Sequence, residues 1–244
     1  MRTAPRLSLL LLALLAVFIS LSPPRLRAWR YLDGALQPIP LPADLQPIPP
    51  TGEFDLDQDR GPDRIELSSK QIFIYTQSNN TASWQSPPDW QVKQALVTDL
   101  NGDGLPELAL LVWRPFQPWP VDSYLPHGGR IADHQDRRGQ SCHLVLIGWL
   151  GTEFGELWAG SALARPLRSI TAADMDGDGM QELVVLESRY NDPGFLPARS
   201  LAVWRWNGFG FDLLARREGR FHRLEVLQFP AGAVLLSSSH ALKR

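Results

Sequence analysis

Two short segments of the chain carry oxygen-bearing side chains at a spacing suited to a metal ion. They read DLNGDGLPEL at residues 99–108 and DMDGDGMQEL at residues 174–183. In both, Asp, Asn or Glu falls at relative positions 1, 3, 5 and 9, and glycine falls at position 6. Calcium takes six to eight oxygen ligands at about 2.3–2.6 Å, and a loop that curls around it points alternate side chains inward. The spacing therefore indicates calcium binding.

The glycine at position 6 fits the same interpretation. A metal loop must turn sharply there, often with a positive φ, and glycine does so at little cost. Position 7, which is Leu105 or Met180, can then offer its backbone carbonyl. Carboxylates this close together repel one another strongly unless a cation lies between them. The alternative is that these segments are Asp-Gly turns without metal. A single motif of this kind is common in proteins, but two complete motifs in one chain are not, which favours metal binding.

A third segment, DLDQDRGPD at residues 55–63, keeps acidic residues at positions 1, 3, 5 and 9. It differs at position 6, which is Arg60, and Gly61 comes one place later. Either Arg60 adopts a turn geometry that is unfavourable for a side chain, or the loop is distorted. We therefore expect this loop to be the weakest of the three sites.

The EF-hand shares part of this spacing but has two further requirements. It needs a bidentate glutamate at position 12 and a helix on each side of the loop. Position 12 is Leu110 in one loop and Val185 in the other, and both lie in apolar runs typical of strands. The EF-hand interpretation therefore fails.

The elements that must position these loops are short β-strands. From residue 52 onward, short apolar runs are broken by Gly, Asp, Asn and Pro, and no long stretch after residue 30 has helical periodicity. The body of the protein is therefore expected to be all-β. The predicted strands cover residues 71–76, 94–98, 107–112, 143–149, 168–172, 182–187, 201–206, 211–216, 223–229 and 233–238.

The acidic loops recur within a larger unit, which is the signature of a repeat architecture. Each unit has a strand, an acidic loop, two strands, a turn and a further strand. Aromatic residues cluster at the hairpin of each unit, for example Trp149 and Phe154, or Trp206 and Phe211. We expect these aromatic side chains to pack between neighbouring sheets rather than to form a platform for a ligand.

The loops, followed by Glu-Leu and an apolar strand, resemble FG-GAP/VCBS repeats, which occur in integrin-like β-propellers. The resemblance covers residues 52–230 and implies binding or adhesion more often than catalysis. It implies a β-propeller-like domain of three to four four-stranded units, at or below the usual minimum for closure. The implied ligands of three calcium ions are Asp99, Asn101, Asp103, Leu105 and Glu107; Asp174, Asp176, Asp178, Met180 and Glu182; and Asp55, Asp57, Asp59, Gly61 and Asp63.

The N-terminus indicates export. Arg2 and Arg6 precede an apolar run at residues 7–21, which is the pattern of a signal peptide or of an N-terminal membrane anchor. We assign residues 1–22 to this segment, with residues 7–21 as a possible membrane tether. The proline-rich residues 23–51 are predicted to form a semi-rigid spacer. Residues 52–244 are then the folded domain, which we expect to face away from the cytoplasm.

Composition excludes some partners and sources of stability. The formal net charge of −2 gives no reason to expect nucleic acid, which usually requires a basic face. Cys142 is the only cysteine, so the chain contains no intramolecular disulfide. Bound metal is one way in which an exported domain without disulfides gains stability.

The insertion at residues 115–140 is the other place where metal-ligating side chains gather. Its residues could form a zinc or catalytic site, but their spacing fits no metal motif. A solvated loop is the better interpretation, and it is the best place to look for a specific partner. The residues concerned are Asp122, His127, Asp133, His134 and Asp136.

The function expected from these patterns is not enzymatic. The sequence has no nucleophile elbow, phosphate-binding glycine loop or Cys–His pair. We expect an exported, calcium-binding interaction module whose partner is an extracellular protein or a glycan. The alternative is a polysaccharide-active enzyme or a non-catalytic subunit of one, because two carboxylates across a cleft can hydrolyse a glycoside.

Overall fold

The computed structural model describes residues 25–42, 54–76, 81–118, 124, 133–229 and 233–239. Over these residues the chain forms β-strands and no α-helix, which confirms the predicted all-β class. The strands are β1 (Arg25–Leu32), β2 (Ala35–Ile39), β3 (Arg64–Ser68), β4 (Gln71–Tyr75), β5 (Trp84–Gln85), β6 (Gln91–Thr98), β7 (Glu107–Pro115), β8 (Gln140–Trp149), β9 (Phe154–Ala159), β10 (Leu167–Ala173), β11 (Glu182–Glu187), β12 (Ala198–Trp206), β13 (Phe211–Leu227) and β14 (Val234–Ser239).

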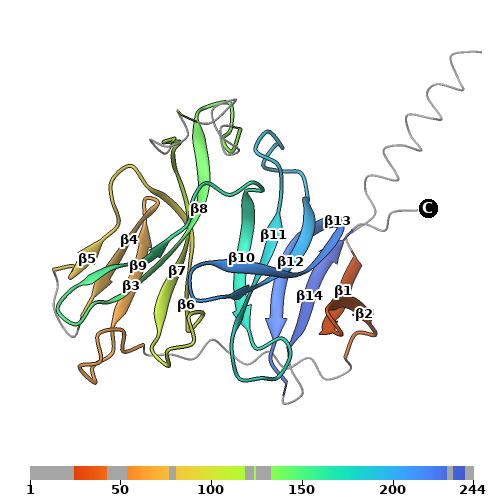
Figure 1. Cartoon of the computed structure of the whole chain (residues 1–244), viewed down its shortest axis with the longest axis horizontal. Coiled ribbons are helices and arrows are strands. Elements are labelled where there is room, and N and C mark those ends of the chain that lie inside the picture. Colours follow the sequence, from red (N-terminus) through yellow and green to blue (C-terminus); the bar gives the residue numbers. More distant parts are fainter. Residues whose placement is uncertain are drawn as a thin grey trace, which may run out of the picture.

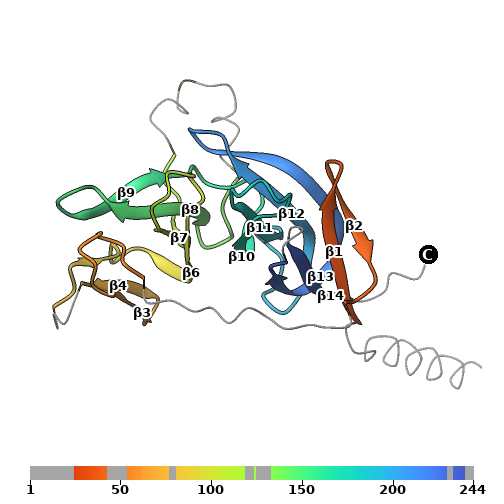
Figure 2. The same ribbon diagram turned by 90° about the horizontal axis from the view of Figure 1, so that it is seen from below.

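The strands form three antiparallel sheets. Their orders are β3-β4-β5, β6-β7-β8-β9 and β10-β11-β12-β13-β14-β1-β2. Figures 1 and 2 show the three-stranded sheet at one end of the molecule and the β1–β2 hairpin at the other end. None of the sheets closes on itself within the described ranges.

The four-stranded sheet is covered on both faces because its central strands are apolar on both faces. Successive side chains of a strand point to opposite sides. Leu110 of β7 therefore packs in one core cluster with Ile74 of β4, in the three-stranded sheet. Its neighbour Leu111 packs in another cluster with Leu183 of β11, in the seven-stranded sheet. The sheets thus lie as successive layers.

The seven-stranded sheet bends at β13, which joins its two halves. The first part of β13 pairs with β12 and its last part pairs with β14, and both registers are irregular near Phe221. The two halves share one core cluster, in which Val203 of β12 lies with Trp29 of β1 and Leu235 of β14. Residues 211–216 and 223–229, predicted as two strands, therefore belong largely to one long strand.

Residues 25–39 form a hairpin and not the predicted spacer. Strand β1 pairs with β14 on one side and with β2 on the other. Trp29 is buried, and its Nε1 donates a hydrogen bond of 2.7 Å to Ser237 Oγ of β14. Pro38 is tolerated because β2 is an edge strand, where a missing N–H need not break the ladder. The predicted strand at residues 233–238, part of β14, therefore pairs with a strand from early in the chain.

The predicted signal peptide or anchor at residues 1–22 lies outside the described residues, as do residues 23–24 and 43–51 of the predicted spacer. Among the residues that the structure describes, no helix has the length and apolar character needed to cross a membrane.

Candidate metal centres

The three acidic loops occupy equivalent places in the strand order. Residues 99–106 connect β6 to β7, and residues 174–181 connect β10 to β11. Residues 55–63 lie between an isolated bridge at Phe54 and strand β3. The second and third loops are in contact, because Gln181 Oε1 accepts a hydrogen bond of 3.2 Å from Asp99 N. The first and second loops together line one small cavity.

The carboxylate at position 9 is tied to the start of each loop. It accepts a hydrogen bond from the backbone N–H of position 2, which holds the strand that follows the loop against the loop's first residues. The bonds are Leu56 N to Asp63 Oδ2 at 2.5 Å, Leu100 N to Glu107 Oε1 at 2.7 Å and Met175 N to Glu182 Oε2 at 2.8 Å.

The carboxylate at position 1 holds the turn at position 6. It accepts the N–H of that residue in each loop, from Arg60 to Asp55 at 2.9 Å, from Gly104 to Asp99 at 3.0 Å and from Gly179 to Asp174 at 3.0 Å.

The first loop follows the same path as the others without glycine at its turns. Arg60 has a φ of 71° and Gln58 a φ of 62°, close to the values of 84° and 72° for Gly104 and Gly102. Of the two possibilities left open by the sequence, Arg60 therefore adopts the unfavourable turn geometry. Non-glycine residues with positive φ are uncommon, and such backbone strain is retained only where the surrounding structure supports it.

Three groups of carboxylates converge closely enough to hold a metal ion. In each group one oxygen from every residue lies within 4.8 Å of the others. The groups are Asp55, Asp57 and Asp63; Asp99, Asp103 and Glu107; and Asp174, Asp176 and Glu182. The structure thus brings together nine of the predicted ligands, three from each loop.

Other predicted ligands make local contacts. Asp59 Oδ1 accepts the N–H of Gly61 at 2.6 Å, and Asp178 Oδ1 accepts the N–H of Met180 at 2.8 Å. Asn101 Nδ2 donates to Asp103 Oδ2 at 3.0 Å. That the backbone carbonyls of Gly61, Leu105 and Met180 bind metal stays a prediction.

The carboxylate of Glu107 is buried and only half satisfied. The residue is 1% exposed, and its Oε2 has no hydrogen-bond partner among the described residues. Burial raises the pKa of Glu107 to about 7, despite the N–H groups of Leu100 and Asn101. A buried charge is costly unless it is paired, so this carboxylate requires a proton or a cation. Asp63 in the first loop has an unpartnered Oδ1 and a pKa that burial also raises.

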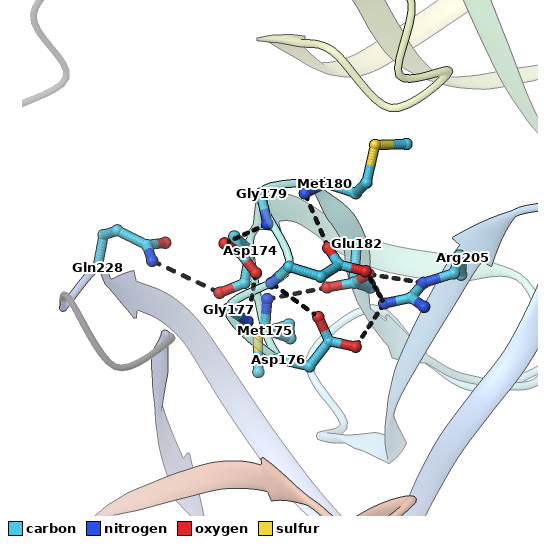
Figure 3. Close-up of polar contacts among 10 residues, drawn as sticks. Asp174, Met175, Asp176, Gly177, Gly179, Met180, Glu182, Arg205 and Gln228 are labelled. Carbon is cyan, nitrogen blue, oxygen red and sulfur yellow. Dashed lines mark hydrogen bonds and ion pairs between the residues drawn. The ribbon is translucent and has the colours of Figure 1, made fainter.

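The third loop contains a cation of its own. Arg205 of β12 donates from Nε and Nη2 to Glu182 Oε1, at 2.8 and 2.5 Å (Figure 3). The same Nη2 lies 2.6 Å from Asp176 Oδ2 and 3.2 Å from Asp178 Oδ2. Both oxygens of Glu182 are therefore partnered. The loop pattern gave no sign of Arg205, which lies outside the loop and reaches it only through the pairing of β11 with β12.

The predicted insertion site is not assembled in the described residues. Asp122 and His127 lie outside those residues. His134 Nδ1 lies 3.2 Å from Ala162 O, and Asp136 Oδ1 accepts the N–H groups of Arg138 and Gln140. Neither of these two, nor Asp133, belongs to a metal-competent group in the part of the chain that the structure describes.

Ser141 and His143 form the contact that most resembles a nucleophile–base pair. Ser141 Oγ lies 2.7 Å from His143 Nε2, and His143 Nδ1 lies 2.9 Å from Gly160 O. Both residues are buried in β8, and burial lowers the pKa of His143 to about 4. The neighbouring Cys142 is also buried, and burial raises the pKa of its thiol to about 12. In this conformation these groups are sealed in the core, away from any substrate.

A comparison of the chain with protein-family models, curated proteins and solved structures found no match in any of the three. The function is therefore argued from the loops themselves.

Proposed function

We propose that this chain is an exported calcium-binding β-repeat protein that acts as a binding or structural interaction module. The observation that carries the proposal is the buried Glu107 carboxylate, which has one unpartnered oxygen and lies beside Asp99 and Asp103. A site that concentrates negative charge in this way is stabilised by a cation. The carboxylates of the first loop have the same need, because Asp55 Oδ1 and Asp63 Oδ1 also lack partners among the described residues.

The donor set favours calcium over other metals. The three convergent groups contain carboxylates and neither histidine nor cysteine, and such all-oxygen sites suit hard cations. Magnesium demands a nearly ideal octahedron and usually keeps several waters, whereas calcium accepts more ligands in a looser arrangement. An acidic loop with alternating side-chain oxygens suits calcium better. We propose that calcium binds to the ligands predicted from the sequence for the first and second loops.

We also propose that the chain is a repeat protein of the FG-GAP/VCBS type with a propeller-like arrangement. Two observations support this proposal. The acidic loops share their hydrogen bonds and their place ahead of a strand, and the sheets pack as layers through apolar faces.

The proposed location is outside the cytoplasm, with residues 1–22 as signal peptide or anchor. The pattern of Arg2, Arg6 and the apolar run supports this location. Protease added to intact cells should digest the folded body. Full protection in intact cells, together with a cytosolic fraction that holds all of the protein, would remove this part of the proposal.

Titration calorimetry with CaCl₂ tests the metal-binding part. Chelator-treated full chain should bind calcium saturably, with a dissociation constant of about 10⁻⁴–10⁻³ M, as is typical of extracellular calcium modules. Asp103→Asn should remove one site, because it takes a carboxylate from the second loop. Asp133→Asn is the matched control outside the loops and should bind as the wild type does. Equal binding by both variants would exclude the second loop as a site.

A further inference from the structure

We propose that Arg205 is a built-in cation of the third loop, so that calcium binds tightly at the second loop and weakly or not at all at the third. This inference rests on the proposed calcium binding. It assigns different roles to two loops whose sequences are nearly identical.

The strand register makes the two loops directly comparable. Leu108 pairs with Ile147, which places Glu107 opposite Gly148 at the start of the β7–β8 ladder. Leu183 pairs with Trp204, which places Glu182 opposite Arg205 at the start of the β11–β12 ladder. The same position therefore holds no side chain beside the second loop and a guanidinium beside the third.

The two loops differ in how their carboxylates are neutralised. Arg205 contacts three carboxylates of the third loop. It partners Glu182 Oε1, while the N–H of Met175 partners Glu182 Oε2. In the described part of the chain, no Lys or Arg forms an ion pair with Asp99, Asp103 or Glu107, and Glu107 Oε2 has no partner. Arg205 therefore neutralises carboxylates of the third loop. The second loop has the same need for a positive charge, and no described side chain provides one.

The structure also has space beside Glu107. A cavity of about 30 Å³ is bounded by Asp103, Glu107 and Gly148 of the second unit, and by Leu56 and Gln58 of the first loop. A polar cavity above about 10–15 Å³ has room for a water-sized occupant. At Gly148 the space that a side chain would need is filled by the apolar Leu157, which also lines the cavity, so no cationic side chain reaches Glu107 from this position.

Calcium at the third loop would have to displace this arginine. Hydrogen bonds between a guanidinium and carboxylates are charge-assisted and strong. An ion that shares Asp176 and Glu182 must break them, and the ion gains less because one positive charge is already present. We expect calcium to bind the third loop at least tenfold more weakly than the second.

Exchanging the residues at this register position tests the inference. Arg205→Gln removes the charge while keeping a long polar side chain, and it should add one calcium ion to the number bound per chain. The readout is titration calorimetry of the full chain with CaCl₂. Asp178→Asn in the wild-type background should leave the tight sites unchanged, because the third loop does not contribute one.

The reverse exchange provides a second variant if Arg205→Gln folds poorly. A side chain at Gly148 would meet Leu157 Cδ1 at 2.5 Å, so Gly148→Arg is made together with Leu157→Ala and compared with Leu157→Ala alone. The added arginine should remove one bound calcium ion.

The possible results separate this inference from the calcium proposal. One more ion for Arg205→Gln, or one fewer for Gly148→Arg, supports the inference. If both variants bind calcium but the number of ions bound per chain is unchanged, the inference is overturned and the calcium proposal stands. Loss of a tight site in Asp178→Asn has the same meaning. No calcium bound by the wild type or by Arg205→Gln would overturn both.

Discussion

At the residue scale, the second and third loops show how one side chain outside a motif changes its chemistry. Glu107 and Glu182 have the same sequence context and the same hydrogen bond to the start of their loop. They differ because Arg205 reaches Glu182, whereas Gly148 provides nothing to Glu107. Nine of the eleven carboxylates in the predicted ligand sets converge, and Asp59 and Asp178 belong to no convergent group of described residues. The loop sequence could not predict Arg205, which lies 23 positions after Glu182 and becomes its neighbour only through strand pairing.

His143 should make the protein sensitive to acid. Its pKa in the folded state is about 4, below the usual 6.5, because burial disfavours the charged ring. Between pH 6.5 and pH 4 the unfolded state therefore binds more protons, and stability falls as the pH falls through this range. The full difference corresponds to about 3 kcal/mol in the free energy of unfolding.

Urea unfolding of the wild type and of His143→Gln at pH 7.5, 5.5 and 4.5 measures this contribution. The wild type should lose more stability than the variant over this range, whatever the variant's stability at pH 7.5. Carboxylates common to both proteins, Glu107 among them, cancel in the comparison. Parallel pH dependence in the two proteins would mean that the pKa of His143 is the same in the folded and unfolded states.

At the element scale, strands with strong apolar runs were predicted, whereas β1, β2, β3, β5 and β9 were not. Strand β7 was found because its run is buried on both faces. Strand β1 was missed because Leu26 and Leu32 are exposed and only its centre, at Ala28 and Trp29, is buried. Its arginines and the prolines after it favoured a spacer. This segment forms a strand because it pairs with the backbone edge of β14, which lies far away in the sequence. The sequence near β1 therefore does not reveal it.

The β1–β2 hairpin should contribute strongly to stability. Trp29→Ala removes a buried indole from the core between the two halves of the seven-stranded sheet and deprives Ser237 of its donor. Loss of a buried aromatic side chain of this size typically costs about 3–5 kcal/mol. Leu26→Ala is the control on the same strand and should cost less than about 1 kcal/mol, because Leu26 is exposed. Equal urea midpoints for the two variants would show that the hairpin is not part of the core.

At the scale of the whole molecule, the fold has layers joined by apolar faces, and the acidic loops lie between consecutive strands of those layers. A chain with one cysteine cannot use an intramolecular disulfide to hold these layers together. Calcium bound at the loops would instead stabilise the connections from which β3 and β7 begin. The all-β class followed from the sequence. The order of strands did not, because it depends on β13 joining two half-sheets and on β1 completing the second half.

If calcium is part of the folded protein, as proposed, a calorimetric melt should show its contribution to the stability of the fold. At about 1 mM calcium, a site with a dissociation constant near 10⁻⁴ M adds about 1.4 kcal/mol, so two sites add about 3 kcal/mol. The full chain in 1 mM CaCl₂ should therefore melt about 6–12 °C higher than in chelator, given about 2–4 °C per kcal/mol for a domain of this size. Equimolar MgCl₂ should restore little of this difference. The same melting temperature in chelator and in calcium would contradict the account.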